Sequence, residues 1–433
     1  MADTNDLITM KASVGPSAVM RGMKNSTHVY FDIVTGEKTE TARPPVDLCI
    51  VLDRSGSMAS KGKLKTAKAA MKSVVEGLSG GDRFAVILYD TGVETLFGLE
   101  TYDLSKEKEL VLSQIDAIKT KGCTNLYGGL EEGLKQFSST TDKTRNQKIF
   151  LFSDGLVNAG IQDSKKILAL ATSIADKGIG LDSFGVGDDF NEDLMRDIGE
   201  NGCGRFLFVE DADAMEQFVS FAMKGIFALV ARHAKLKVRG AGDGVAEKMY
   251  GGDLLGGFVL NDLTTNNSRG VLVEATLSPK ECGNVELLKW ELTYKDLDNQ
   301  ERSLTGIVHV EVTEDEKKVR EVNVPVEVAR QIRLAVEIDL EIEKLLDQNK
   351  RDEAIKRKKA YMEGLDELLK LDEDNIKLKS HVLAQKRAMK DLEDRSVSIQ
   401  KNRKLGKKNM YKAMHDSGEY CMNDYVHEIK KVS

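Results

Sequence analysis

The chain has few cysteines and few prolines for its 433 residues, five of each. The cysteines stand far apart, at positions 49, 123, 203, 282 and 421, and no two of them form a Cys-x-x-Cys pair. Zinc cages and disulfide frameworks need closer or regular spacing, so neither is expected. These absences predict a cytoplasmic protein whose cysteines stay reduced.

Long hydrophobic runs are also missing. No apolar stretch reaches the ~18 residues that span a membrane, and the first residues lack the pattern of a secretory signal. The net charge of −7 argues against bulk affinity for nucleic acid or for membranes. A chain of 433 residues is too long for one core, which predicts two or three domains.

The pattern of residues 46–228 predicts a doubly wound α/β domain. Continuous apolar runs alternate with helical periods, which is typical of a mostly parallel sheet covered on both faces. The expected strands are 46–53, 83–89, 93–97, 147–153, 180–186 and 205–209. The expected helices are 61–78, 105–119, 125–138, 163–177, 191–200 and 211–228.

The flanking segments follow other patterns. Residues 1–27 show no clear period, which predicts partial order, whereas 28–42 alternate weakly as a strand or hairpin. Short alternating strands parted by Gly, Asn and Asp fill 229–325 and predict an antiparallel β-sandwich. From 326 to 433 the period is helical, with two helices expected to join at Asn349 in a hairpin or small bundle.

A chemically distinctive stretch is VDLCIVLDRSGSM, residues 46–58, where a buried strand stops at a carboxylate. The period of two in an extended turn can point Asp53, Ser55 and Ser57 the same way. These are hard oxygen donors, suited to magnesium or manganese, and they lie at the strand end where doubly wound folds bind ligands.

Two further oxygen donors are expected at the same edge of the sheet. Asp154 follows another apolar strand, and Thr124 lies in the loop before a helix. Each residue has a simpler interpretation by itself: Thr124 or Ser57 as a helix N-cap, and Asp154 as part of a turn. The coincidence of all five at strand ends and adjacent loops favours one metal site.

This combination resembles the von Willebrand factor A domain. The motif Asp53-x-Ser55-x-Ser57, then Thr124, then Asp154 in Ser-Asp-Gly carries the resemblance over residues 46–228, with Cys123 where many relatives have glycine. It implies a Rossmann-like fold and a metal-ion-dependent adhesion site holding Mg²⁺, or else Mn²⁺ or Ca²⁺. An Asp or Glu of a partner protein would complete the metal's coordination.

The flanks resemble intracellular proteins in which the A domain interrupts a β-sandwich. This resemblance implies that residues 1–45 contribute strands to the sandwich of 229–325. Some plant relatives of this kind are ubiquitin ligases with an amino-terminal RING zinc finger. This chain lacks the cysteine and histidine ladder of a RING finger, so ligase activity is not expected.

Three other functions compete with metal-dependent binding. Catalysis is not expected, because 46–228 contains no histidine and no Gly-x-Ser-x-Gly elbow. The basic segment 400–412 could contact nucleic acid, although a solvated helix face is the favoured interpretation. The sandwich and helices could instead dock into a larger assembly, with the metal site non-essential. The sequence does not indicate an oligomeric state.

Overall fold

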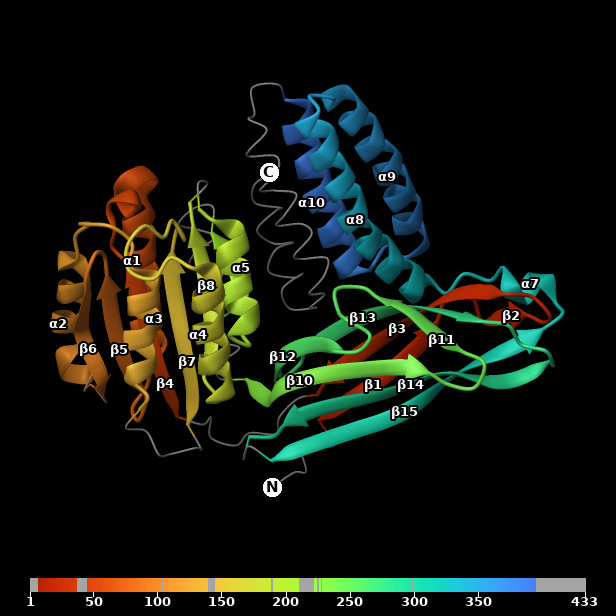
Figure 1. Ribbon diagram of the computed structural model, residues 1–433, viewed down its shortest axis with the longest axis horizontal. Coiled ribbons are helices and arrows are strands. Elements are labelled where there is room, and N and C mark those ends of the chain that lie inside the picture. The colour runs from red at the N-terminus through yellow and green to blue at the C-terminus, as the bar shows by residue number, and fades with distance from the viewer. Residues whose placement is uncertain are drawn as a thin grey trace. The chain divides into compact units, whose positions relative to one another are not determined.

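The computed structural model divides the chain into two compact units (Figure 1). One unit comprises Met1–Thr39, Val230–Asp296 and Gln300–Ser433, and the other comprises Glu40–Leu229 with Leu297–Asn299. The second unit is therefore inserted into the first. The structure describes residues 7–36, 45–100, 102, 104–138, 145–187, 190–209, 222, 223, 226, 228–297 and 300–394.

The inserted unit is built on a six-stranded sheet with the strand order β6-β5-β4-β7-β8-β9. All eight residues of the central strand β4 are buried, as expected of a parallel strand covered on both faces. Strands β5 and β7 flank β4 in parallel, and β6 alone among the described strands of this sheet runs antiparallel. The strands are β4 (Val46–Asp53), β5 (Arg83–Tyr89), β6 (Val93–Glu100), β7 (Asn146–Ser153), β8 (Gly180–Val186) and β9 (Phe206–Val209).

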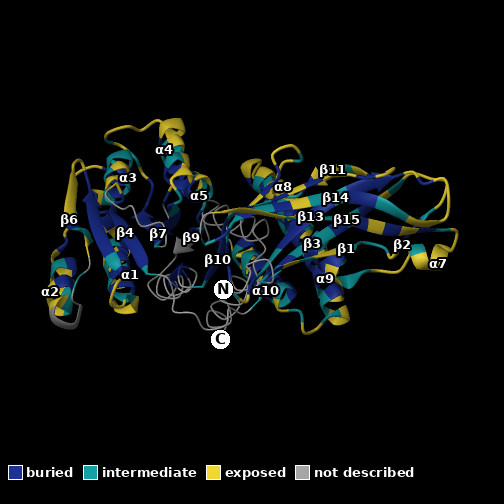
Figure 2. Cartoon of the chain, turned by 90° about the horizontal axis from the view of Figure 1, so that it is seen from below, coloured by how far each residue is buried: buried dark blue, intermediate teal, exposed yellow. Residues whose placement is uncertain are grey.

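Helices lie on both faces of this sheet, with α1 on one face and α3 and α4 on the other (Figure 2). Asn125, Asp163 and Asn191 cap α3, α4 and α5 by accepting a backbone N–H, which explains where these helices begin. The helix expected at 211–228 lies largely outside the described residues. The described helices are α1 (Lys63–Gly77), α2 (Leu104–Ala117), α3 (Leu126–Lys135), α4 (Ser164–Asp176) and α5 (Glu192–Asn201).

The other unit contains a β-sandwich of two sheets around a buried apolar core. Strand β3 pairs with β13, with Val34 opposite Ser268, so the segment before the inserted unit joins strands that follow it. Residues 1–27 show no clear period in the sequence, yet β1 and β2 lie there. One sheet is β1 (Ile8–Val14), β3 (Asn25–Thr35), β13 (Ser268–Leu277) and β11 (Val245–Met249). The other is β12 (Phe258–Thr264), β10 (Leu229–Gly240), β14 (Gly283–Lys295), β15 (Glu301–Thr313) and β2 (Ala18–Met20).

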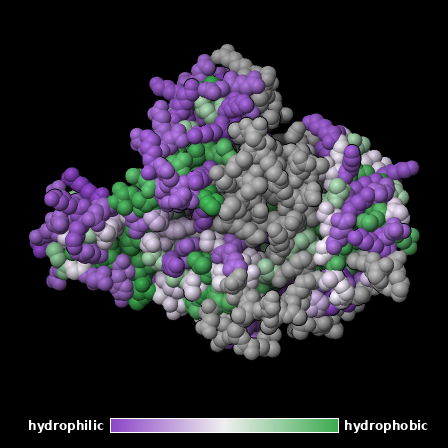
Figure 3. Space-filling view, turned by 180° about the vertical axis from the view of Figure 1, so that it is seen from behind, coloured by the Kyte–Doolittle hydropathy of each residue, from purple (hydrophilic) through white to green (hydrophobic). Residues whose placement is uncertain are grey.

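Within the described residues up to 394, the short helix α7 (Glu316–Val319) is followed by three longer helices: α8 (Val324–Asp347), α9 (Arg351–Leu371) and α10 (Ile376–Glu393). Asn349 adopts the left-handed conformation (φ 57°) between α8 and α9, which ends α8 at the position that the sequence indicated. Val326 and Ala329 pack on Leu272 of β13, which joins α8 to the sandwich. Hydrophilic residues dominate the face of these helices seen in Figure 3. No helix among the described residues is long and apolar enough to cross a membrane.

Candidate metal centre

Asp53 ends β4 as a completely buried carboxylate. Its Oδ1 accepts the backbone N–H of Ser55 at 2.8 Å, and its Oδ2 accepts the hydroxyl of Ser153 at 2.8 Å. Ser153 is the last residue of β7, the parallel neighbour of β4. Because parallel strands end at the same edge of a sheet, β7 fixes the carboxylate in place.

The hydroxyls of Ser55 and Ser57 face each other in the turn after β4. Their Oγ atoms lie 3.0 Å apart, with Ser55 buried and Ser57 half-buried. Ser55 stands at the N-cap of the 3-10 helix η2 (Gly56–Gly62), and its side chain makes no capping bond. The capping interpretation of Ser57 is therefore wrong, and the two hydroxyls are within hydrogen-bond distance of each other.

Backbone hydrogen bonds tie the loop that carries Thr124 to this turn. Gly56 N donates to Gly122 O at 3.1 Å, and Lys121 N donates to Arg54 O at 2.8 Å. Thr124 is buried, and Asn125 rather than Thr124 caps α3. The N-cap interpretation of Thr124 is thus wrong as well. Cys123 is exposed, so its side chain does not enter the buried side of the loop.

Arg54 links the turn after β4 to the residues that follow β5 through two ion pairs. This role was not identified from the sequence. The Nε of Arg54 donates to Asp90 Oδ2 at 2.7 Å and its Nη2 to Glu94 Oε2 at 2.6 Å, although only 8% of the residue is exposed. Asp90 O in turn accepts the backbone N–H of Asn125, next to Thr124. These bonds fix the position of the Thr124 loop relative to the turn that follows Asp53.

Asp154 follows β7 and is paired with a lysine. Lys63 Nζ lies 3.1 Å from Asp154 Oδ2, and both side chains are almost completely buried. The stem of Lys63 passes over Gly187 (φ 89°), where a Cβ would come within 2.5 Å of Lys63 Cε. Sequence reasoning also missed Lys63. A signal was present, because a lysine in the first turn of α1 opposes the helix dipole and requires another reason to be there.

Burial and a neighbouring carboxylate disfavour the charged form of Asp53, whereas Asp154 is already paired with the buried Lys63. Burial raises the pKa of Asp53 to about 6, and the charge of Asp154 adds to the rise, against hydrogen bonds from Ser55 and Ser153 that lower it. No group of three or more His, Cys, Asp or Glu residues in the described part of the chain has the arrangement of a metal site. The candidate donors are instead two carboxylates and three hydroxyls, all hard oxygens, which suit magnesium better than zinc.

Known proteins match this chain mainly over the inserted unit. The von Willebrand factor type A domain family matches residues 47–221. Uncharacterized protein YfbK of Escherichia coli is 27% identical over 213 residues, 49% of this chain and 36% of that protein. Probable E3 ubiquitin-protein ligase WAVH2 of Arabidopsis thaliana is 28% identical over 152 residues, 32% of this chain and 21% of that protein. The chain thus spans well under two thirds of the length of these relatives.

Solved structures match nearly the whole chain at low identity. A von Willebrand factor type A protein from Catenulispora acidiphila has a TM-score of 0.69 and 15% identity, over 94% of this chain and 96% of that one. The ArnB paralog VWA2 from Sulfolobus acidocaldarius has a TM-score of 0.59 and 15% identity, over 94% and 98%. These similarities show a shared fold. Together with the family match, they identify residues 47–221 as a von Willebrand factor type A domain.

Proposed function

We propose that this protein is a divalent-metal-dependent protein-binding module. In this proposal Asp53, Ser55, Ser57, Thr124 and Asp154 hold Mg²⁺, with Mn²⁺ or Ca²⁺ as alternatives. When bound, the metal offers an open coordination position to an Asp or Glu of a partner protein. Von Willebrand factor type A domains are generally modules of protein–protein interaction, which supports this choice.

One observation carries the proposal: the buried Asp53 carboxylate and the Ser55 and Ser57 hydroxyls converge in a turn that is hydrogen-bonded to the Thr124 loop. Magnesium requires about six ligands in near-octahedral geometry. Five side chains therefore leave at least one coordination position for an exchangeable ligand. The chain's own residues thus orient the oxygens, and a partner's carboxylate supplies the last donor.

Docking into a larger assembly through the sandwich and helices is the second candidate, because α8 packs on the sandwich and joins both into one unit. The metal site would then be non-essential. Nucleic-acid contact through 400–412 lies outside the described residues. We propose no catalytic role, and the cytoplasmic location stays a prediction.

Isothermal titration of Mg²⁺ and Mn²⁺ tests the site directly. We expect binding by the native chain and by Asp176→Ala, whose exposed carboxylate ends α4, and loss of binding by Asp53→Ala. Equal affinity in Asp53→Ala and the native chain would contradict the metal site.

The second step is capture from native lysate with the tagged chain, with magnesium, with EDTA, and with Asp53→Ala in magnesium. Partners lost in both the EDTA and Asp53→Ala arms support metal-dependent recognition. Partners retained in all three arms would favour docking through the sandwich and helices.

A further inference from the structure

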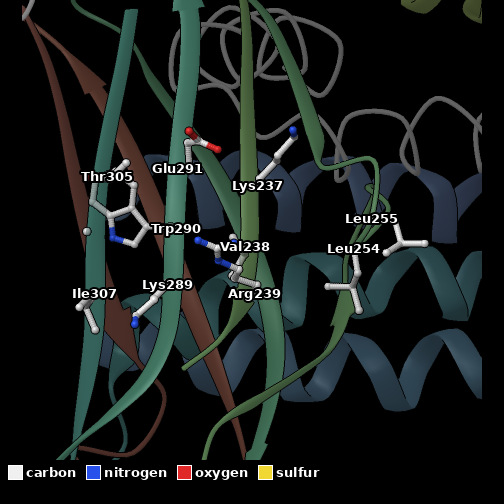
Figure 4. A pocket seen from close by; sticks show the side chains of 11 residues that line it. Lys237, Val238, Arg239, Leu254, Leu255, Lys289, Trp290, Glu291, Thr305 and Ile307 are labelled. Atoms are coloured by element: carbon white, nitrogen blue, oxygen red, sulfur yellow. The ribbon is translucent and has the colours of Figure 1, made fainter. Parts of the chain in front are cut away.

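The β-sandwich carries a groove of about 510 Å³, far along the chain from the candidate metal ligands. Its lining comes from β10, β14 and β15 and from the loop between β11 and β12. In Figure 4, Lys237 and Arg239 lie between Trp290 on one side and Leu254 and Leu255 on the other. A volume of this size lies within the range of ligand-binding clefts.

The groove is positively charged in a chain whose net charge is −7. Lys237 and Arg239 alternate with the buried Leu236 and Val238, so both cations stand on the solvent side of β10. Neither forms a salt bridge with the residues that the structure describes. Lys289, opposite Arg239 on β14, adds a third cation and has only a long 3.5 Å contact to Glu286.

Large apolar side chains beside these cations are exposed to solvent. Leu255 is 93% exposed and Ile307 is 42% exposed, which leaves apolar surface beside the cations for the side chain of a partner. Trp290 stands opposite the buried Val238 and packs against the sandwich core, so its half-buried ring lies beneath the groove, on the other face of the sheet from the cations. Arginine is enriched at protein-binding surfaces, and here Arg239 shares the groove with the exposed Leu255 and Ile307.

We propose that this groove binds an acidic segment of a partner protein. Acidic side chains of the segment pair with Lys237 and Arg239, and an apolar side chain packs against Leu255 and Ile307. Glu291, opposite Lys237 on β14, repels phosphates and carboxylates alike, so the preference against nucleic acid comes from the small number of cations. A phosphate backbone gains affinity from many cations, and here it would meet three cations with a carboxylate among them.

Trp290 is the only tryptophan of the chain, so its fluorescence reports on this groove without a label. The probe is a short peptide of glutamate, leucine and serine without tryptophan, titrated into the full chain. We expect a saturable change in emission that persists in EDTA, which separates this site from the proposed metal centre. A matched peptide with glutamine in place of glutamate is expected to bind much more weakly.

Two variants locate the binding. Lys237→Glu/Arg239→Glu reverses both cations and is expected to weaken peptide binding by about tenfold or more, because two attractions become repulsions. Lys356→Glu/Lys370→Glu makes the same charge change at exposed positions of α9 and is expected to bind as the native chain does. Leu255→Ser, at a position too exposed to affect folding, is expected to weaken binding about threefold.

Three results would overturn the proposal. The first is equal affinity for the glutamate and glutamine peptides. The second is equal peptide affinity in the groove variant and the α9 variant. The third is a change in Trp290 emission with a single-stranded oligonucleotide or with phosphatidylserine vesicles but none with the acidic peptide.

Discussion

The buried lysine beside Asp154 leads to a quantitative prediction about metal affinity. Lys63→Met removes a positive charge 3.1 Å from Asp154 Oδ2 and keeps an unbranched stem over Gly187. If a divalent cation binds at Asp154, the ammonium group repels it and competes for the same oxygen. The variant is therefore expected to bind Mg²⁺ more tightly than the native chain does.

The expected size follows from Coulomb's law. A doubly charged ion about 6 Å from the ammonium is repelled by about 5 kcal/mol at an effective dielectric constant of about 20. The lysine can move aside when the metal binds, so the measured gain is smaller, about 1.5–3 kcal/mol, or about ten- to hundredfold in affinity. Without metal, the variant leaves Asp154 buried and unpaired, a loss of about 3–5 kcal/mol in the free energy of unfolding.

Isothermal titration and thermal unfolding with and without Mg²⁺ measure both effects. We expect Lys63→Met to have a lower Tm without metal and a larger upward shift of Tm in saturating Mg²⁺. Lys177→Met, which removes an exposed lysine after α4, is the matched control and is expected to leave both quantities unchanged. Unchanged or weaker Mg²⁺ affinity in Lys63→Met would refute the reasoning.

Three further predictions concern stability. The pKa of Asp53, about 6 when folded, lies above its unfolded value of 3.8, so the metal-free stability falls by up to about 3 kcal/mol from about pH 4 to 7. Measuring Tm against pH for the native chain and for Asp53→Asn tests this. The same slope of Tm against pH in both proteins would contradict it. Lys358→Met breaks the buried ion pair with Asp339 and is expected to lower the free energy of unfolding in urea by about 3–5 kcal/mol. Lys358→Met/Asp339→Leu is expected to recover this stability, and a double variant as unstable as Lys358→Met would refute that account. Gly129→Ala forces a Cβ to within 2.6 Å of the Tyr89 ring and is expected to cost about 1–3 kcal/mol, unlike Ala at the open Gly364 after allowance for helix propensity.

Much of the α/β unit could be predicted because its strands are uniformly apolar. Burial of every residue of β4 leaves no ambiguity about its period or its place in the sheet. The gathering of Asp53 and Asp154 could also be anticipated, since the carboxyl ends of neighbouring parallel strands share one edge. The metal itself is still a proposal.

Other features have weaker signals in the sequence. In β1 only Ile8 is buried. Because this edge strand has little alternation of apolar and polar residues, its sequence pattern is like that of an irregular segment. Lys63 and Arg54 are cations whose burial depends on where Asp154 and Asp90 lie after folding. The groove requires the register that places Arg239 opposite Lys289, which pairing between distant strands decides.

The insertion of one unit into the other has a consequence for synthesis. Val34 of β3 pairs with Ser268 of β13, so the first strands of the sandwich must wait on the ribosome until the whole inserted unit has emerged. At about 5–20 residues per second, this delay is on the order of ten seconds or more. The inserted unit needs none of the later strands for its sheet and can fold first. The amino-terminal strands, with unpaired edges meanwhile, are then the part of the nascent chain most exposed to misassociation.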